Sequence, residues 1–113
     1  MPTVTLIAPI LPGKAEAWRR FAQELRASRY GEYLESRHRL GIRSEQAWIA
    51  ETLRVAVAII TLDTPQPEQL LDQLATSDLP FDRWFKEQLL ALQGVDLTRL
   101  QLDLVFNWQT PEV

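Results

Sequence analysis

Residues 54–62, RVAVAIITL, constrain the fold more than any other stretch of this 113-residue chain. The run is rich in β-branched and aliphatic residues, which is typical of a β-strand. Successive side chains of a strand point to opposite faces of its sheet, and here both sets are largely apolar. The two sets are Val55, Val57, Ile59 and Thr61 on one face, and Ala56, Ala58, Ile60 and Leu62 on the other. We therefore expect a central strand that is covered on both sides.

The remaining segments predict an alternation of strands and helices. In chain order the predicted elements are a strand over 3–8, a helix from 14 that continues to 37, a hairpin of strands over 45–52 and 54–62, a helical region in two pieces over 68–75 and 80–92, and a strand over 100–109. Gly41 and Gly94 follow predicted helices, where a left-handed residue commonly ends the helix. The order βαββαβ predicts a single ferredoxin-like α+β domain over residues 1–113, with a four-stranded antiparallel sheet and helices on one face.

The uncovered face of that sheet predicts a homodimer. Helices cover only one side, so half of the apolar side chains of residues 54–62 would meet water. The last predicted strand adds the apolar row Leu102, Leu104, Phe106 and Trp108. Because an exposed apolar patch of more than a few hundred Å² is uncommon on a soluble monomer, we expect two sheets to face one another across a two-fold axis. The alternative is a monomer in which Ala56 and Ala58 lie under a tightly packed helix.

Composition excludes several classes of function. A net charge of -3 gives no reason to expect a nucleic acid or an anionic membrane as partner. Cysteine is absent and His38 is the single histidine, so no metal site and no cofactor are predicted. The apolar run near the N-terminus is too short to span a bilayer and lacks a preceding basic region. We expect a cytoplasmic protein.

One cluster has the residue types of catalytic chemistry. Tyr33 and Arg37 are four residues apart and should share a helix face, and His38 follows directly. Together they offer a phenol, a guanidinium for an anion or enolate, and a group that titrates near neutrality. The alternative is a solvated, basic helix end that the helix dipole favours. Tyr33, Arg37 and His38 are the candidate catalytic residues.

Aromatic residues suggest a ligand site between the helices and the sheet. Trp48 and Trp84 could enclose a planar apolar molecule, and Asn107 could donate to its carbonyl. Gln88 is the lone polar residue in the inward stripe of the helix over 80–92, and therefore marks a possible buried cavity. The alternative is that the rings only fill the core. In the same helix, Asp82 and Lys86 are expected to form an ion pair on the outer face.

Three stretches of the chain resemble a known superfamily. LPGKAEAWRRFAQEL, SRHRLGIRSEQAWIAET and SDLPFDRWFKEQLLALQGVDL are similar to an uncharacterised bacterial family of the dimeric α/β-barrel superfamily. That superfamily includes the antibiotic-biosynthesis monooxygenases and EthD-like proteins. The resemblance implies a ferredoxin-like subunit in a dimeric α/β barrel, and it transfers no particular activity, since members of the superfamily differ in chemistry.

Two functions from different classes follow. The first is a dimeric protein that binds a small apolar or aromatic molecule, or acts as an accessory protein, without a catalytic apparatus. The second is a cofactor-independent monooxygenase or isomerase acting on an aromatic or enolisable molecule, with a Tyr or His proton acceptor and an Arg for developing negative charge. A closed cavity that holds Tyr33, Arg37 or His38 would favour the enzyme.

Overall fold

The computed structural model describes residues 3–99, with only the backbone of Glu68, together with Trp108 and Pro111. The elements, in chain order, are β1 (Thr3–Ile10), α1 (Ala15–Arg26), α2 (Tyr30–Arg39), β2 (Ser44–Glu51), β3 (Ala56–Asp63), α3 (Pro67–Thr76) and α4 (Pro80–Gln93). An α+β fold is confirmed. The strand predicted over 100–109 lies outside the described residues except at Trp108, which belongs to no helix or strand and is 65% exposed.

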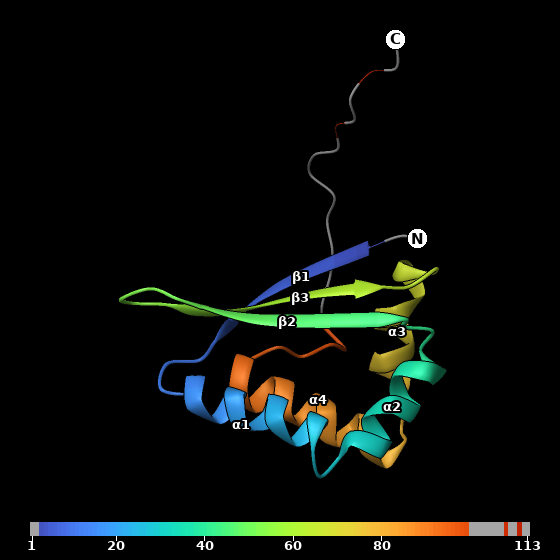
Figure 1. Ribbon diagram of the computed structural model, residues 1–113, viewed down its shortest axis with the longest axis horizontal. Helices are drawn as coiled ribbons and strands as arrows, with labels where there is room; N and C mark the ends of the chain where they lie inside the picture. Colours follow the sequence, from blue (N-terminus) through green and yellow to red (C-terminus); the bar gives the residue numbers. More distant parts are fainter. Residues whose placement is uncertain (1–2, 100–107, 109–110, 112–113) are drawn as a thin grey trace.

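Within the described residues, three strands form an antiparallel sheet in the order β1-β3-β2. At the centre of β3, Ile59 lies opposite Ile7 of β1 and Trp48 of β2. Since β3 is antiparallel to both neighbours, β1 and β2 run parallel to each other, which is the split βαβ arrangement. Three strands of the predicted four are therefore present, and the outer edge of β1 has no partner in the described part of the chain (Figure 1).

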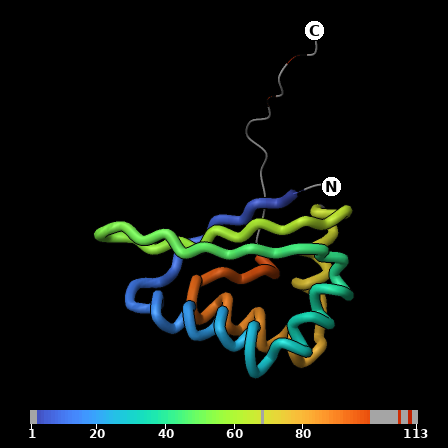
Figure 2. Tube along the Cα trace, viewed as in Figure 1, coloured from blue at the N-terminus to red at the C-terminus, as the bar shows by residue number. Residues whose placement is uncertain are grey.

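Helices α1, α2 and α4 form a layer on one side of the sheet, as predicted, and α3 stands at the end where β3 finishes (Figures 1 and 2). The prediction of one continuous helix from 14 to 37 is wrong. The chain leaves the helix at Ala27, whose φ of -127° and ψ of -95° are not helical, and the amide of Arg29 donates back to the carbonyl of Glu24. This turn redirects α2, which buries Ser36 and Arg37.

An aromatic cluster joins α4 to α1. The ring of Phe21 lies 5.6 Å from that of Trp84 and 5.5 Å from that of Phe85, and Phe81 lies 5.7 Å from Trp84. Phe21, Phe81 and Phe85 are buried. Since ring pairs at such distances add to the stabilisation from burial, the first turns of α4 anchor the helical layer. Gly94 ends α4 in the left-handed conformation, as predicted.

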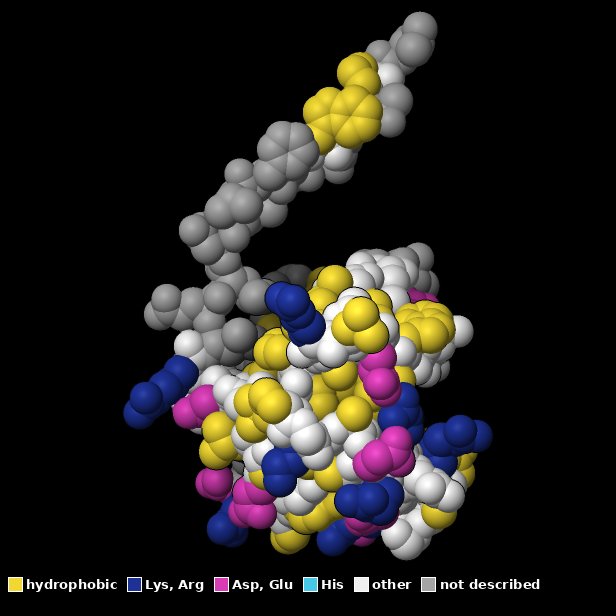
Figure 3. All heavy atoms as spheres, turned by 90° about the vertical axis from the view of Figure 1, so that its left-hand side faces the viewer, with side chains coloured by type: hydrophobic (Ala, Val, Ile, Leu, Met, Phe, Trp, Pro, Cys, Tyr) yellow, Lys and Arg dark blue, Asp and Glu magenta, His cyan; other side chains and the backbone are white. Residues whose placement is uncertain are grey.

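The outer face of the sheet carries the second apolar surface that residues 54–62 predict. Ile7, Ile59 and Trp48 form one row across it, and Ile7 is 66% and Trp48 49% exposed. In the end-on view of Figure 3, most charged side chains lie over the helical layer, and apolar side chains reach the surface nearer the sheet. None of the described helices combines the length and the apolar character needed to cross a bilayer.

Candidate functional site

A cavity of about 390 Å³ lies between the inner face of the sheet and helices α2, α3 and α4. Two small residues on the inner face of the sheet explain why it forms there. Ala8 of β1 and Ala58 of β3 are directly opposite each other in the register, and both line the cavity. Because their side chains end at Cβ while the flanking inward residues Leu6 and Ile60 are large, the pair leaves a hollow in an otherwise filled layer.

The walls of the cavity are mostly aliphatic. Its lining includes Leu40 and Ile42 after α2, Leu70, Leu71 and Leu74 of α3, and Phe85 and Leu89 of α4. Thr5, Ile7 and Pro9 also line it, although their side chains belong to the outer face of the sheet. The cavity therefore reaches the edge of β1 that has no partner among the described residues.

An ion pair lines part of the cavity. Arg37 of α2 is 8% exposed, and its Nε donates to the Glu45 carboxylate of β2 at 2.7 Å. The Tyr33 hydroxyl donates to the same carboxylate oxygen at 2.6 Å, and the Arg37 guanidinium also donates to Ser36. The guanidinium lies 4.7 Å from the ring centre of Phe85. Charge-assisted bonds of this kind are short and strong, so the cluster is rigid and its charges cancel.

Tyr33 is a hydrogen-bond donor at neutral pH. Burial, together with the negative charge of Glu45 and the hydrogen bond to it, raises the pKa of Tyr33 to about 12. The phenol consequently keeps its proton and donates it in a hydrogen bond to the Glu45 carboxylate. A group in this state does not serve as a proton acceptor.

Gln93 contributes a polar group without a partner. It is the last residue of α4, it is 3% exposed, and it lines the cavity. Among the described residues, no acceptor lies within hydrogen-bond distance of its Nε2. A buried donor left in this state costs about 1–3 kcal/mol relative to one that is satisfied. Sequence reasoning did not single it out, although it lies four residues after Leu89 and so shares a helix face with it.

The structure brings together two of the three candidate catalytic residues. Tyr33 and Arg37 share a face of α2, as their spacing predicts, and meet at Glu45. Arg37 is not part of a solvated helix end, because it is buried. His38 is exposed and does not line the cavity. Glu45, like Gln93, is a residue of the cavity that the sequence reasoning missed.

The three candidate ligand-binding residues that the structure describes do not line the cavity. Trp48 is on the outer face of the sheet. Trp84 is half-buried in the aromatic cluster, and the Arg29 guanidinium lies 4.0 Å from its ring centre. Gln88 is half-buried, and neither it nor the two tryptophans line the cavity. Asn107 lies outside the described residues.

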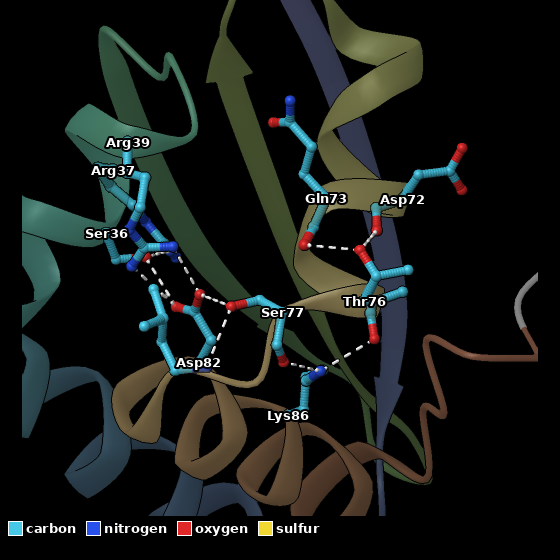
Figure 4. Close-up of polar contacts among 11 residues, drawn as sticks. Ser36, Arg37, Arg39, Asp72, Gln73, Thr76, Ser77, Asp82 and Lys86 are labelled. Carbon is cyan, nitrogen blue, oxygen red and sulfur yellow. Dashed lines mark hydrogen bonds and ion pairs between the residues drawn. The ribbon is translucent and has the colours of Figure 1, made fainter.

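A second polar cluster contradicts the prediction of a surface ion pair in α4. Asp82 is fully buried and accepts hydrogen bonds from Arg39 at 2.7 Å and from Ser36 and Ser77 (Figure 4). Lys86 instead donates to the backbone carbonyls of Ala75 and Ser77, at the end of α3. The i,i+4 spacing is helical as expected, but α2 packs over Asp82 and removes it from solvent. This cluster fixes α2 and the α3–α4 connection against α4.

Within residues 3–99, no three His, Cys, Asp or Glu side chains gather in a way that could hold a metal ion. Comparisons with protein-family models, with curated proteins and with solved structures find no match to the chain. The resemblance to the dimeric α/β-barrel superfamily therefore stays a prediction.

Proposed function

We propose that this chain binds a small, uncharged, largely apolar molecule in the cavity between its sheet and its helices. The observation that supports the proposal is the cavity itself. Its volume of about 390 Å³ falls within the range of roughly 300–1,000 Å³ that is typical of small-molecule sites. The lining is apolar with a few polar groups, and the hollow arises from Ala8 and Ala58 at adjacent positions of two strands.

The fluorescence of N-phenyl-1-naphthylamine, a neutral apolar dye, tests the proposal. The dye should show a saturable increase in emission with the wild-type chain. Ala8→Leu places a larger side chain in the cavity and should weaken binding by at least about fivefold, the lower end of the cost of overpacking. Ala91→Leu makes the same change at an exposed position of α4 and should leave binding unchanged. Thermal unfolding of each variant shows whether the fold is retained.

Two results contradict the proposal. The first is emission that never saturates, which indicates surface adsorption. The second is an equal loss of binding in Ala8→Leu and Ala91→Leu, which places the dye elsewhere.

The proposal includes a homodimer formed through the outer face of the sheet. The row of exposed Ile7 and Trp48 with half-buried Ile59 between them supports it, since burying apolar surface contributes about 25 cal/mol per Å². Light scattering should give twice the mass of the chain at micromolar concentration, and Ile7→Lys should give the monomer. Gln23→Lys, at an exposed position of α1, is the matched control. A monomeric wild-type chain would refute the dimer.

A fourth strand over residues 100–109 completes the proposed ferredoxin-like subunit. The outer edge of β1, which has no partner among the described residues, and the alternation of the sequence LQLDLVFNWQ support it. Nuclear Overhauser contacts between backbone protons of residues 100–109 and β1 would establish the pairing. Their absence in a well-resolved spectrum would exclude it.

The enzymatic alternative stays a prediction. Arg37 lines the cavity, as that alternative expects, but the alternative also requires Tyr33 or His38 as proton acceptor. Tyr33 keeps its proton, and His38 is outside the cavity. A cytoplasmic location likewise stays a prediction, which rests on the absence of cysteine.

A further inference from the structure

Helix α3 forms one wall of the cavity, yet it is not part of the layer that the other helices build. Leu70, Leu71 and Leu74 of α3 line the cavity, and Leu70 and Leu74 are buried. Figures 1 and 2 show α3 at the end of the sheet where β3 finishes. Helices α1, α2 and α4 pack on one another, whereas α3 makes only slight contact with any other described element. The buried side of α3 therefore meets the cavity rather than a closely packed element.

The polar contacts that hold α3 in place lie at its C-terminal end. Lys86 of α4 donates to the carbonyl oxygens of Ala75 and Ser77, at 3.0 and 2.8 Å. The Ser77 hydroxyl donates to buried Asp82 at 2.5 Å (Figure 4). No side-chain hydrogen bond or ion pair of the described residues joins residues 67–74 to another element. The helix is thus held at one end.

Opening at the other end of α3 is a small change compared with unfolding. Movement of the Pro67 end away from the sheet breaks none of the hydrogen bonds at Ser77, and it exposes chiefly Leu70 and Leu74. Local openings that lose few apolar contacts have smaller free energies than global unfolding. A ligand in the cavity gives both leucines further apolar contacts in the closed position alone, so it favours that position.

The cavity reaches the edge of β1 on another side, at Thr5, Ile7 and Pro9. The proposed fourth strand would lie along this edge and cover it. With that strand in place, a ligand needs another way in, and α3 is the wall that is held at one end.

We propose that α3 is a lid on the cavity, which swings about Ser77 to admit an apolar molecule and closes on it through Leu70 and Leu74. Lys86 and Asp82 fix the hinge, because both bind the chain at Ser77. This inference rests on the proposed function and adds the conformational change that admits the ligand.

Distances between pairs of spin labels, measured by double electron–electron resonance, test the lid. The chain has no cysteine, so an introduced pair is labelled without background. Gln69→Cys lies near the free end of α3 and Asp78→Cys just beyond the hinge, and each is combined with Gln23→Cys in α1. All three positions are exposed. The labelled chain is mixed with an excess of unlabelled chain, so that distances between two copies do not contribute.

Without a ligand, labels at Gln69 and Gln23 should give two distances, one for the open and one for the closed lid. Saturating N-phenyl-1-naphthylamine should remove the open population, and labels at Asp78 and Gln23 should give one distance throughout. Leu70→Ala removes a buried contact of the closed lid and should raise the ratio of open to closed by about tenfold. Leu34→Ala, at an exposed position of α2, is the control and should leave the ratio unchanged.

Thermal unfolding shows whether each variant retains the fold. Leu71→Ala, at a half-buried position of the same wall, replaces Leu70→Ala if that variant does not fold.

The outcomes separate the lid from the function on which it rests. If the dye binds saturably but the distance between Gln69 and Gln23 is single, and neither the dye nor Leu70→Ala changes it, cavity binding stands and the lid is refuted. Two distances at Asp78 that change together with those at Gln69 also refute it, because the chain would then not be fixed at Ser77. If the wild-type chain does not bind the dye, the proposed function fails, and the lid as a ligand gate fails with it.

Discussion

Asp82→Asn should be among the most destabilising isosteric substitutions in this chain. The carboxylate is fully buried and receives hydrogen bonds from Arg39, Ser36 and Ser77. The amide of asparagine has the same shape but no charge. Its NH2 group takes the place of one carboxylate oxygen, and this donor would face side chains that are themselves donors. Arg39 loses its partner in the ion pair, and at least one of the two hydroxyls must reorient.

The magnitude follows from the burial of the two partners. Hydrogen bonds to a charged group contribute about 1.5–3 kcal/mol. Asp82 is fully buried, but the Arg39 side chain is 34% exposed and regains part of its hydration when the pair is broken. We therefore expect a loss of about 1.5–3 kcal/mol in the free energy of unfolding rather than the sum over all three bonds. At about 4 °C per kcal/mol, the melting temperature should fall by about 6–12 °C.

The loss should depend on pH in a defined direction. Burial alone raises the pKa of the Asp82 carboxyl, but the hydrogen bonds from Arg39 and Ser77 and the charge of Arg39 outweigh it and leave the pKa below its ordinary value. A lowered pKa in the fold stabilises the protein at every pH above the unfolded value of about 3.9. This stabilisation disappears as the pH falls through the lower pKa of the folded state, where the carboxylic acid resembles the amide.

Urea unfolding followed by tryptophan fluorescence, at several pH values between about 7 and 3, measures the effect. The difference between wild type and Asp82→Asn should be constant near neutrality and shrink below about pH 4. Asp78→Asn, at an exposed position before α4, is the control and should change stability by less than about 0.5 kcal/mol. A difference for Asp82→Asn as small as that of the control, or one that does not shrink in acid, would refute the reasoning.

Three other substitutions test separate parts of the structure by the same unfolding assay. The pKa of Tyr33 is about 12 in the fold and about 10 in the unfolded chain, so the wild type should lose stability as the pH rises through this range. Tyr33→Phe should lose less stability over the same range. Parallel plots of unfolding free energy against pH for the two proteins would contradict this. Gly94→Ala should cost about 1 kcal/mol of stability, because φ is 67° and the added Cβ would lie 3.4 Å from Leu11. Its control, Gly31→Ala in α2, should be neutral or stabilising. Equal effects of the two substitutions would contradict this. Trp18→Phe should cost less than about 1.5 kcal/mol, since it also removes a buried N–H without a described partner; a loss above about 3 kcal/mol would show that the indole is needed.

The order of elements was predictable because each has its own periodicity. Residues 54–62 alternate as a strand, and the apolar residues of α1 and α4 recur at three and four positions. The break between α1 and α2 was not predictable in the same way. Ala27, where the helix ends, has a high helix propensity, and the only glycine nearby is Gly31, inside α2. The requirement to bury Ser36 and Arg37 overrides local preference there.

The candidate site was predictable only in part. Spacing in one helix placed Tyr33 beside Arg37, but their shared partner Glu45 comes from a strand, and only the packing of α2 on β2 brings it there. For Asp82 the spacing within one helix led to a wrong prediction. Its spacing to Lys86 is typical of a surface pair, and the helix that covers it is distant in sequence. Charges are thus hard to place from sequence, because a helical pattern says which residues share a face and not what covers that face.

The position of the cavity connects the proposed ligand to the proposed fourth strand. The cavity reaches Thr5, Ile7 and Pro9, at the edge of β1 where residues 100–109 would pair. A strand at that edge would become a wall of the site, so ligand binding and strand pairing would stabilise each other. N-Phenyl-1-naphthylamine at a concentration that just saturates the wild-type chain should therefore slow amide hydrogen exchange in residues 100–109, and Ala8→Leu should reduce this effect. Exchange rates there that are unchanged by a ligand whose binding is independently measured would show that the site is complete without this segment.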